Sequence, residues 1–247
     1  MTPAAEVLGV RVHAVDRAGL LDRVSLLVSA GTPATVGYAN VHVLNTAASE
    51  PGLRAFLNTL DLCYCDGNGV KWAARATGQA MPERMTGADW IWDFAARAEG
   101  QWRVFWVGGE PGVAEEAATR LRARHPGLVV ATDHGFHDDV APLLARINGF
   151  RPDILLVGMG TPVQERWVQR WRSALEVPVV WMLGATHDFV SGRVRRGPAW
   201  LHGNHEWLAR LLVDPKRLWR RYLLGNTLFV GRVIIQRLWG EPRIPGP

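Results

Sequence analysis

The sequence predicts an α/β protein in which helices cover both faces of a Rossmann-like, mostly parallel sheet, followed by a basic helical C-terminal appendage. First, short runs rich in β-branched and aromatic residues alternate with segments whose apolar residues recur at helical spacing. Second, residues 193–247 hold 11 basic and 3 acidic side chains, whereas residues 1–192 hold 17 and 20. We therefore predict an α/β domain over 1–192 and an appendage over 193–247.

The predicted elements alternate regularly along the first domain. Strands are expected at residues 10–15, 35–39, 62–66, 103–108, 128–132, 153–158 and 177–183, most of them buried because they are apolar throughout. Helices are expected at 17–29, 87–98, 113–124, 140–147 and 163–175, where apolar residues return every three or four positions. Strands that alternate with helices in this way form parallel sheets.

The two cysteines and the N-terminus indicate the compartment. Cys63 and Cys65 lie on one predicted strand, about 6.6 Å apart, so they could form a bridge only with strain. The absence of a disulfide framework favours a reducing compartment. The N-terminus has no basic stretch followed by an apolar core, and the uncharged window 24–49 is interrupted by polar residues, glycine and proline. We expect a cytoplasmic protein without a signal peptide or spanning helix.

Glycine-rich turns follow three of the predicted strands. They begin at Asp66, Gly108 and Gly158, and a helix is expected to follow each of them, in the first case from about Asn68. Backbone N–H groups at such helix starts can bind phosphate, although a glycine turn can also be only a tight chain reversal. No turn has the Gly-Lys-Ser/Thr pattern or the full dinucleotide spacing, which argues against a kinase, a P-loop NTPase or an NAD dehydrogenase.

The appendage combines arginines with apolar and aromatic residues. In a helix that starts at Pro215, the side chains of Arg217, Arg220 and Arg221 share one face. That face could bind a diphosphate or anionic lipid headgroups. The interleaved apolar residues are typical of an interfacial helix, but they could instead pack the appendage onto the domain or onto another subunit.

These residues together resemble the WecG/TagA/CpsF glycosyltransferases, family 26 of the sugar transferases. The resemblance covers residues from about Thr35 to Tyr222. It rests on an ordered set of motifs, which are Asn40 after a strand, Asp66-Gly67-x-Gly69, Glu83-Arg84-x-x-Gly87-x-Asp89, Gly108-Gly109-x-Pro111-Gly112, Gly158-x-Gly160-x-Pro162-x-Gln164-Glu165-x-Trp167, Gly192 through Arg196-x-Pro198, Glu206-Trp207-x-x-Arg210-Leu211, Pro215 and Arg221-Tyr222.

The resemblance implies an inverting, metal-independent transfer of a sugar from a UDP donor to a sugar on a polyprenyl diphosphate. It implies that Asp66 is the catalytic base, with Asn40, Arg84 and Gln164 around it, and that the appendage completes the nucleotide site and touches the membrane. Tyr38 stands where members often have Thr. The other implied substrate-binding residues are Gly67, Asn68, Gly87, Asp89, Gly108, Gly109, Gly158, Gly160, Pro162 and Glu165, and the implied diphosphate ligands are Arg196, Arg217, Arg220 and Arg221.

The chemistry can also be considered without the family. An inverting transfer needs a base, and Asp66 at a strand exit is placed for it, although an Asp there could also only cap the next helix. The sequence has no Asp-x-Asp pair for a divalent ion. Two histidine pairs are spaced too closely to suggest zinc, and Asp138 and Asp139 suit a helix cap; the histidines are His134, His137, His202 and His205. We therefore expect no metal and no cofactor.

The predicted partners are a UDP-sugar, a polyprenyl-diphosphate-linked sugar and an anionic membrane surface on the inner face of the cell membrane. Self-association into a homo-oligomer is left open. Two alternatives remain: a non-catalytic membrane-associated scaffold of polysaccharide assembly, and a nucleic-acid-binding protein that uses the basic appendage. We favour the enzyme and expect no nucleic-acid partner.

Overall fold

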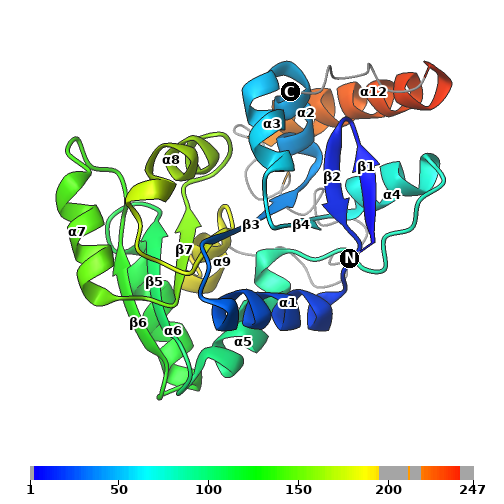
Figure 1. Ribbon diagram of the computed structural model, residues 1–247. Coiled ribbons are helices and arrows are strands. Elements are labelled where there is room, and N and C mark those ends of the chain that lie inside the picture. Colours follow the sequence, from blue (N-terminus) through cyan, green and yellow to red (C-terminus); the bar gives the residue numbers. More distant parts are fainter. Residues whose placement is uncertain (1–2, 195–210, 212–217, 240–247) are drawn as a thin grey trace.

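The computed structural model describes residues 3–194, 211 and 218–239. Within these residues eight strands form one sheet in the order β1-β2-β4-β3-β8-β7-β5-β6 (Figure 1). The strands are β1 (Ala4–Val7), β2 (Val10–His13), β3 (Ala34–Ala39), β4 (Leu62–Cys65), β5 (Arg103–Gly108), β6 (Val129–Asp133), β7 (Ile154–Gly158) and β8 (Val179–Met182). The β1–β2 pair is antiparallel and the other pairs are parallel, so the predicted fold class is confirmed.

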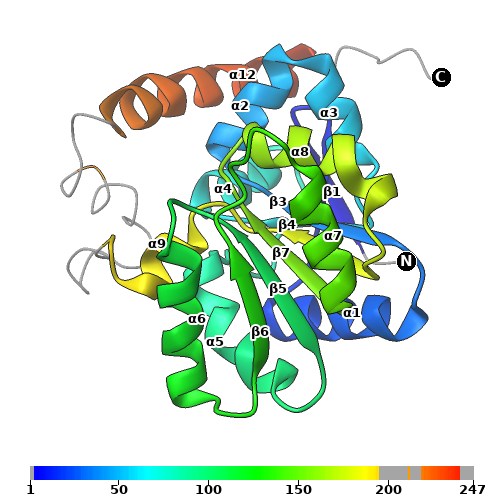
Figure 2. The same ribbon diagram turned by 90° about the vertical axis from the view of Figure 1, so that its left-hand side faces the viewer.

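Helices cover both faces of this sheet. They are α1 (Arg17–Ala30), α2 (Val41–Ser49), α3 (Pro51–Asn58), α4 (Asn68–Ala76), α5 (Gly87–Ala98), α6 (Val113–Arg124), α7 (Ala141–Phe150), α8 (Val163–Trp171) and α9 (Thr186–Ser191). Helices α1, α5 and α6 lie on one face, and α2, α3, α7 and α8 on the other (Figure 2). This is the distribution that right-handed crossovers require, because the first group connects strands in one direction along the sheet and the second group in the other.

Some elements differ from the sequence prediction. The strand expected at 10–15 ends at His13, and it is preceded by β1, which the sequence analysis did not predict. β1 is a four-residue edge strand with alternating burial, joined to β2 by Leu8 and Gly9, both with positive φ. Helices α2, α3 and α9 were also not predicted. The helix expected at 163–175 ends at Trp171 and continues as a short 3-10 turn, Arg172–Ala174.

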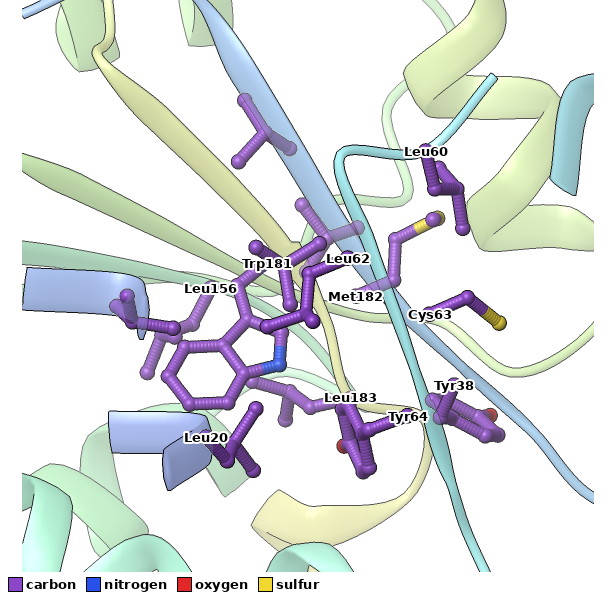
Figure 3. Packing of buried hydrophobic residues seen from close by; sticks show 14 of the residues in the cluster. Leu20, Tyr38, Leu60, Leu62, Cys63, Tyr64, Leu156, Trp181, Met182 and Leu183 are labelled. Atoms are coloured by element: carbon purple, nitrogen blue, oxygen red, sulfur yellow. The ribbon is translucent and has the colours of Figure 1, made fainter. Parts of the chain in front are cut away.

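The core lies between the sheet and the helices and is rich in aromatic side chains. The indole of Trp181 stacks on Trp90 with ring centroids 4.2 Å apart and meets Tyr64 and Phe94 edge-on. Figure 3 shows Trp181 and Tyr64 in one buried cluster with Leu62 of β4, Leu156 of β7 and Leu20 of α1. Cys63 points to the opposite face of the sheet, where it is buried and unbridged, and burial raises its pKa to about 12. The sheet centre is therefore a rigid, dry base for the ends of its strands.

The described part of the appendage is helical, as expected. A π-helical turn, η3 (Arg220–Leu224), leads into α12 (Gly225–Trp239), which packs on α2 and α4 (Figure 1). Phe229 and Val233 are its buried apolar side chains. The guanidinium group of Arg232 donates to Asn45 O at 2.7 Å and to Ser49 Oγ at 2.9 Å, which ties α12 to α2. Among the helices described, none has the length and apolar character needed to cross a membrane.

Candidate active site

A cleft of about 90 Å³ lies at the carboxyl ends of four neighbouring central strands, β4, β3, β8 and β7. This edge is where open α/β sheets bind ligands. Five of the predicted site residues line the cleft, namely Tyr38, Asn40, Asp66, Gly87 and Gly160. The other lining residues are His42, Thr86, Ala88, Thr161, Leu183, Gly184, Ala185, Thr186 and Phe189.

Asp66 and Asn40 form a hydrogen-bonded pair in this cleft. Asn40 Nδ2 donates to Asp66 Oδ2 at 3.0 Å, while Asn40 Oδ1 accepts from the backbone N–H of Val43 at 2.9 Å and caps α2. The backbone N–H of Asp66 donates to Ala39 O, so both residues leave adjacent parallel strands at the same level. Gly67, with φ of +100°, is the cap residue of α4, so Asp66 does not hold the cap position. Asn68 is the first residue of that helix.

Gln164 and Glu165 lie beneath the cleft in the first turn of α8. Gln164 is fully buried, and its Nε2 donates to Tyr38 Oη at 3.2 Å and to Glu165 Oε1 at 2.9 Å. Its Oε1 accepts from the backbone N–H of Gly184 at 2.9 Å. Burial raises the pKa of the Glu165 carboxyl. Pro162, the cap residue of α8, follows the two cleft residues Gly160 and Thr161. Gln164 therefore reaches the cleft through Tyr38 and Gly184.

Three of the predicted glycines pack against or beside α9, and the cleft lining does not include them. A Cβ on Gly109 would lie 2.7 Å from His187 Cδ2, and one on Gly158 would lie 2.5 Å from His187 Nδ1. A Cβ on Gly108 would overlap the backbone of Gly158. His187 is buried, and this burial lowers the pKa of its imidazole. These glycines allow α9, which carries Thr186 and Phe189 into the cleft, to approach the strand ends.

Asp89 and Arg84 are at the start of α5, beside the cleft residue Thr86. The Asp89 carboxylate accepts from Thr86 N and Thr86 Oγ1, both at 3.0 Å, in a capping box. The Arg84 guanidinium lies 3.6 Å from Asp89 Oδ2. Neither Arg84 nor Asp89 belongs to the cleft lining. Their placement makes them supports of the segment that brings Thr86 and Gly87 to the cleft.

The predicted diphosphate ligands are only partly within the described residues. Arg196 and Arg217 lie outside them, as does the predicted helix start at Pro215. Arg220 is exposed in the π-helical turn, with its guanidinium 5.3 Å from the Trp219 ring centroid. Arg221 is in the same turn. At the first residue of the appendage, the Arg193 guanidinium donates to both carboxylate oxygens of Glu116 at 2.8 and 2.9 Å. This pair anchors the start of the appendage to α6.

One group of side chains in the described residues has the composition of a metal site. Asp133 ends β6, and His134 and His137 follow it, with ligand atoms of the three residues within 4.8 Å of one another. The Asp133 carboxylate is already bound by protein groups: Oδ1 accepts from Gly135 N at 3.1 Å and contacts His137 Nε2 at 2.6 Å, and Oδ2 pairs with Arg146. His202 and His205 lie outside the described residues. Asp139 accepts from Ala141 N, the first residue of α7, but the cap residue of that helix is Val140, so Asp139 does not hold the cap position.

Comparison with known proteins identifies the family of the chain. A model of the glycosyl transferase WecG/TagA/CpsF family matches residues 5–243. The chain belongs to this family. A relative from Bacillus spizizenii, an N-acetylglucosaminyldiphosphoundecaprenol N-acetyl-beta-D-mannosaminyltransferase, is 31% identical over 188 residues, covering 75% of this chain and 73% of its own. A protein of the same name from Staphylococcus aureus is 30% identical over 185 residues, covering 74% and 73%.

As a member of the WecG/TagA/CpsF family, the protein is a glycosyltransferase, and several of its cleft residues were not predicted from the sequence. Thr161, Gly184, Ala185 and Thr186 follow β7 and β8, so their position after a strand was a usable signal. His42 lies in the first turn of α2, which was not predicted, whereas Thr86 is the cap residue of α5, whose bounds were predicted correctly. Phe189 faces the cleft from α9, which is too short for periodicity to predict.

Replacement of Gly87 by alanine is expected to destabilise this glycosyltransferase. The added methyl group would overlap the Thr186 side chain, whose Oγ1 donates to Leu183 O at 2.7 Å. Overpacking of this kind costs about 1–3 kcal/mol. Thermal unfolding should therefore show a Tm lowered by about 2–12 °C. The control is Gly149→Ala in α7, where a Cβ meets nothing within 4 Å. Equal Tm values for the two variants would contradict the described contact between α5 and α9.

Proposed function

We propose that the protein transfers a sugar from a UDP-sugar to a sugar carried on a polyprenyl diphosphate, with inversion and without a metal ion. The sugar would be an N-acetylhexosamine, a uronic acid or a hexose, and the product a precursor of teichoic acid, common antigen, capsule or exopolysaccharide. The observation that carries this proposal is the Asp66–Asn40 pair in a cleft at the strand ends of a chain in this family. The names of the relatives from Bacillus and Staphylococcus support a diphosphopolyprenol-linked acceptor.

In the proposed mechanism, Asp66 takes the proton from the acceptor hydroxyl as its oxygen attacks the anomeric carbon. The bond between that carbon and the diphosphate oxygen of UDP lies on the opposite face of the sugar. This bond breaks during the attack, and UDP is the leaving group. Asn40 orients the carboxylate through its hydrogen bond to Oδ2. Arg220 and Arg221, together with Arg196 and Arg217, are proposed to neutralise the departing diphosphate, because arginine binds phosphate groups through paired donors.

The first experiment is a measurement of UDP release from a panel of UDP-sugars, with short-chain polyprenyl-diphosphate sugars as acceptors, in the presence and absence of EDTA. Release that requires the acceptor and resists EDTA supports the proposal. No release with any donor, combined with membrane binding, would favour the scaffold alternative. The nucleic-acid alternative instead predicts binding with a steep salt dependence that the Asp66→Asn substitution does not alter.

We further propose that η3 and α12 bind the inner face of the cell membrane, where the acceptor lipid is held. One side of this segment packs on α2, whereas Leu223, Leu224, Leu228, Ile234, Ile235 and Leu238 are exposed. The segment also carries Arg220, Arg221 and Arg237. Apolar side chains beside cations are typical of a helix that lies in the lipid headgroup region.

Replacement of Leu228, Ile235 and Leu238 together by serine is expected to weaken binding to anionic phospholipid vesicles at least about tenfold, since each loses apolar area that the bilayer would bury. Vesicle co-sedimentation measures the effect. The control is Leu26→Ser, because Leu26 is also an exposed leucine and belongs to α1, a helix on the side of the molecule away from α12 (Figure 1). If the control and the triple variant bind equally, α12 is not the membrane contact.

A further inference from the structure

The side-chain amide of Gln164 has a fixed orientation beneath the cleft. The backbone N–H of Gly184, 2.9 Å from Oε1, can only donate, so it defines which atom is the oxygen. The two N–H bonds of Nε2 then point to Tyr38 Oη at 3.2 Å and Glu165 Oε1 at 2.9 Å. Tyr38 Oη therefore accepts a hydrogen bond from a group that cannot rotate without breaking two others.

Glu165 is the second anchor of that amide. It is 2% exposed, and its Oε1 also accepts from Thr161 Oγ1 at 2.9 Å. Within the part of the chain that the structure describes, its Oε2 has no hydrogen-bond partner. A buried carboxyl in this state is costly for stability, so stability alone does not explain it. Glu165 holds Gln164, and Gln164 in turn holds Tyr38, which lines the cleft.

Tyr38 is confined from three sides. Its ring lies 6.1 Å from the Tyr64 ring, centroid to centroid, on the adjacent strand (Figure 3). Gln164 holds the hydroxyl, and a Cβ on Gly184 would come within 2.5 Å of that hydroxyl. Gly184 also has φ of +59°, which favours glycine. The phenol is thus a fixed wall of the cleft that contains Asp66.

We propose that Tyr38 is a specificity-determining residue that limits the size of the sugar accepted beside Asp66, and that Gln164 and Glu165 are positioning residues that hold this wall in place. The inference rests on the proposed function, because it names what that same cleft selects. A side chain that cannot move excludes sugars whose substituents would overlap it. A mobile side chain could rotate away and admit them. The expected selection is against bulky substituents on the sugar ring.

The test compares kcat/KM for pairs of UDP-sugars that differ only by hydroxyl or acetamido at one ring carbon, such as UDP-glucose and UDP-N-acetylglucosamine. Tyr38→Ala is expected to shift the ratio at least tenfold toward the acetamido donor. Tyr38→Phe keeps the wall and is expected to leave the ratio within about threefold of wild type. If the alanine variant slows both donors equally, or if the phenylalanine variant shifts the ratio as strongly, the inference is wrong.

Glu165 is tested with two variants of similar size. Glu165→Gln retains an acceptor oxygen for Gln164 and Thr161 and is expected to keep the wild-type ratio. Glu165→Leu removes that oxygen and is expected to shift the ratio in the same direction as Tyr38→Ala, by about three- to tenfold. A uniform loss of rate in the leucine variant, with the ratio unchanged, would show that Glu165 does not position Tyr38.

Binding of the donor can be measured without the acceptor, so this measurement does not need turnover. It also does not need Glu165→Leu to fold. The shift in Tm that each UDP-sugar produces is measured for wild type, Tyr38→Phe and Tyr38→Ala. The alanine variant should gain a larger shift with the acetamido donor than wild type shows. Failure of wild type to release UDP from any donor would overturn the proposed function. Activity with ratios that Tyr38 does not control would overturn only this inference.

Discussion

Replacement of Asp66 by asparagine is expected to lower the rate of UDP release about 10²- to 10⁴-fold, which is the usual contribution of a general base. The amide has nearly the same shape, but it cannot accept the proton of the attacking hydroxyl. Donor binding, measured as a UDP-sugar-dependent shift in Tm, should remain, because the cleft walls do not change. The pH-independent loss of kcat with retained binding would identify a chemical role for this carboxylate.

Two further variants make this result specific. Asp93→Asn removes an exposed carboxylate that forms a surface ion pair with Arg17, and it should behave as wild type. Asn40→Ser keeps a helix-capping oxygen for α2 but loses the amide donor to Asp66, so turnover should fall between wild type and Asp66→Asn. Asp66→Asn activity within about threefold of wild type would rule out Asp66 as the base.

Replacement of Trp181 by alanine is expected to cost about 3–5 kcal/mol of stability, the range for large aromatic side chains in a core. Trp181 is fully buried and contacts three other aromatic rings. For a chain of this size the loss corresponds to a Tm lowered by about 6–20 °C. The measurement is thermal or urea unfolding of the full chain.

The matched control for this variant is Trp239→Ala. Trp239 is 77% exposed at the end of α12, so its loss should change the free energy of unfolding by no more than about 0.5 kcal/mol. A change in Trp181→Ala of less than about 1.5 kcal/mol would mean that the aromatic layer repacks and does not depend on this side chain.

The sequence contains strong local signals for some elements and weak ones for others. The bounds of α5 and α6 agree with the prediction, because Thr86 with Asp89 forms a capping box and Gly112 marks the other helix start. β1 has only four residues at a sheet edge, and α2 and α3 are separated by Glu50 alone. Such short elements depend on tertiary contacts that periodicity does not reveal.

The candidate site shows the same division. Asp66 could be predicted from its place after a strand, and Asn40 from the resemblance to the family. Which glycines would face a ligand could not be predicted, because Gly109 and Gly158 pack on His187 of α9. The burial of Gln164 could also not be predicted from its position at a helix start. Its partners Tyr38 and Gly184 are 126 and 20 residues away.

The link between α12 and the N-terminal hairpin has a consequence for synthesis on the ribosome. Gln236 accepts from the backbone N–H of Leu8 at 3.0 Å, so the last described helix binds the turn between β1 and β2. Phe229 of the same helix lies near Gly69, close in the chain to Asp66. Domains fold as units, so this domain can be completed only after α12 has been translated. α12 packs on α4, the helix that follows Asp66, and α4 is covered on that side only from then on.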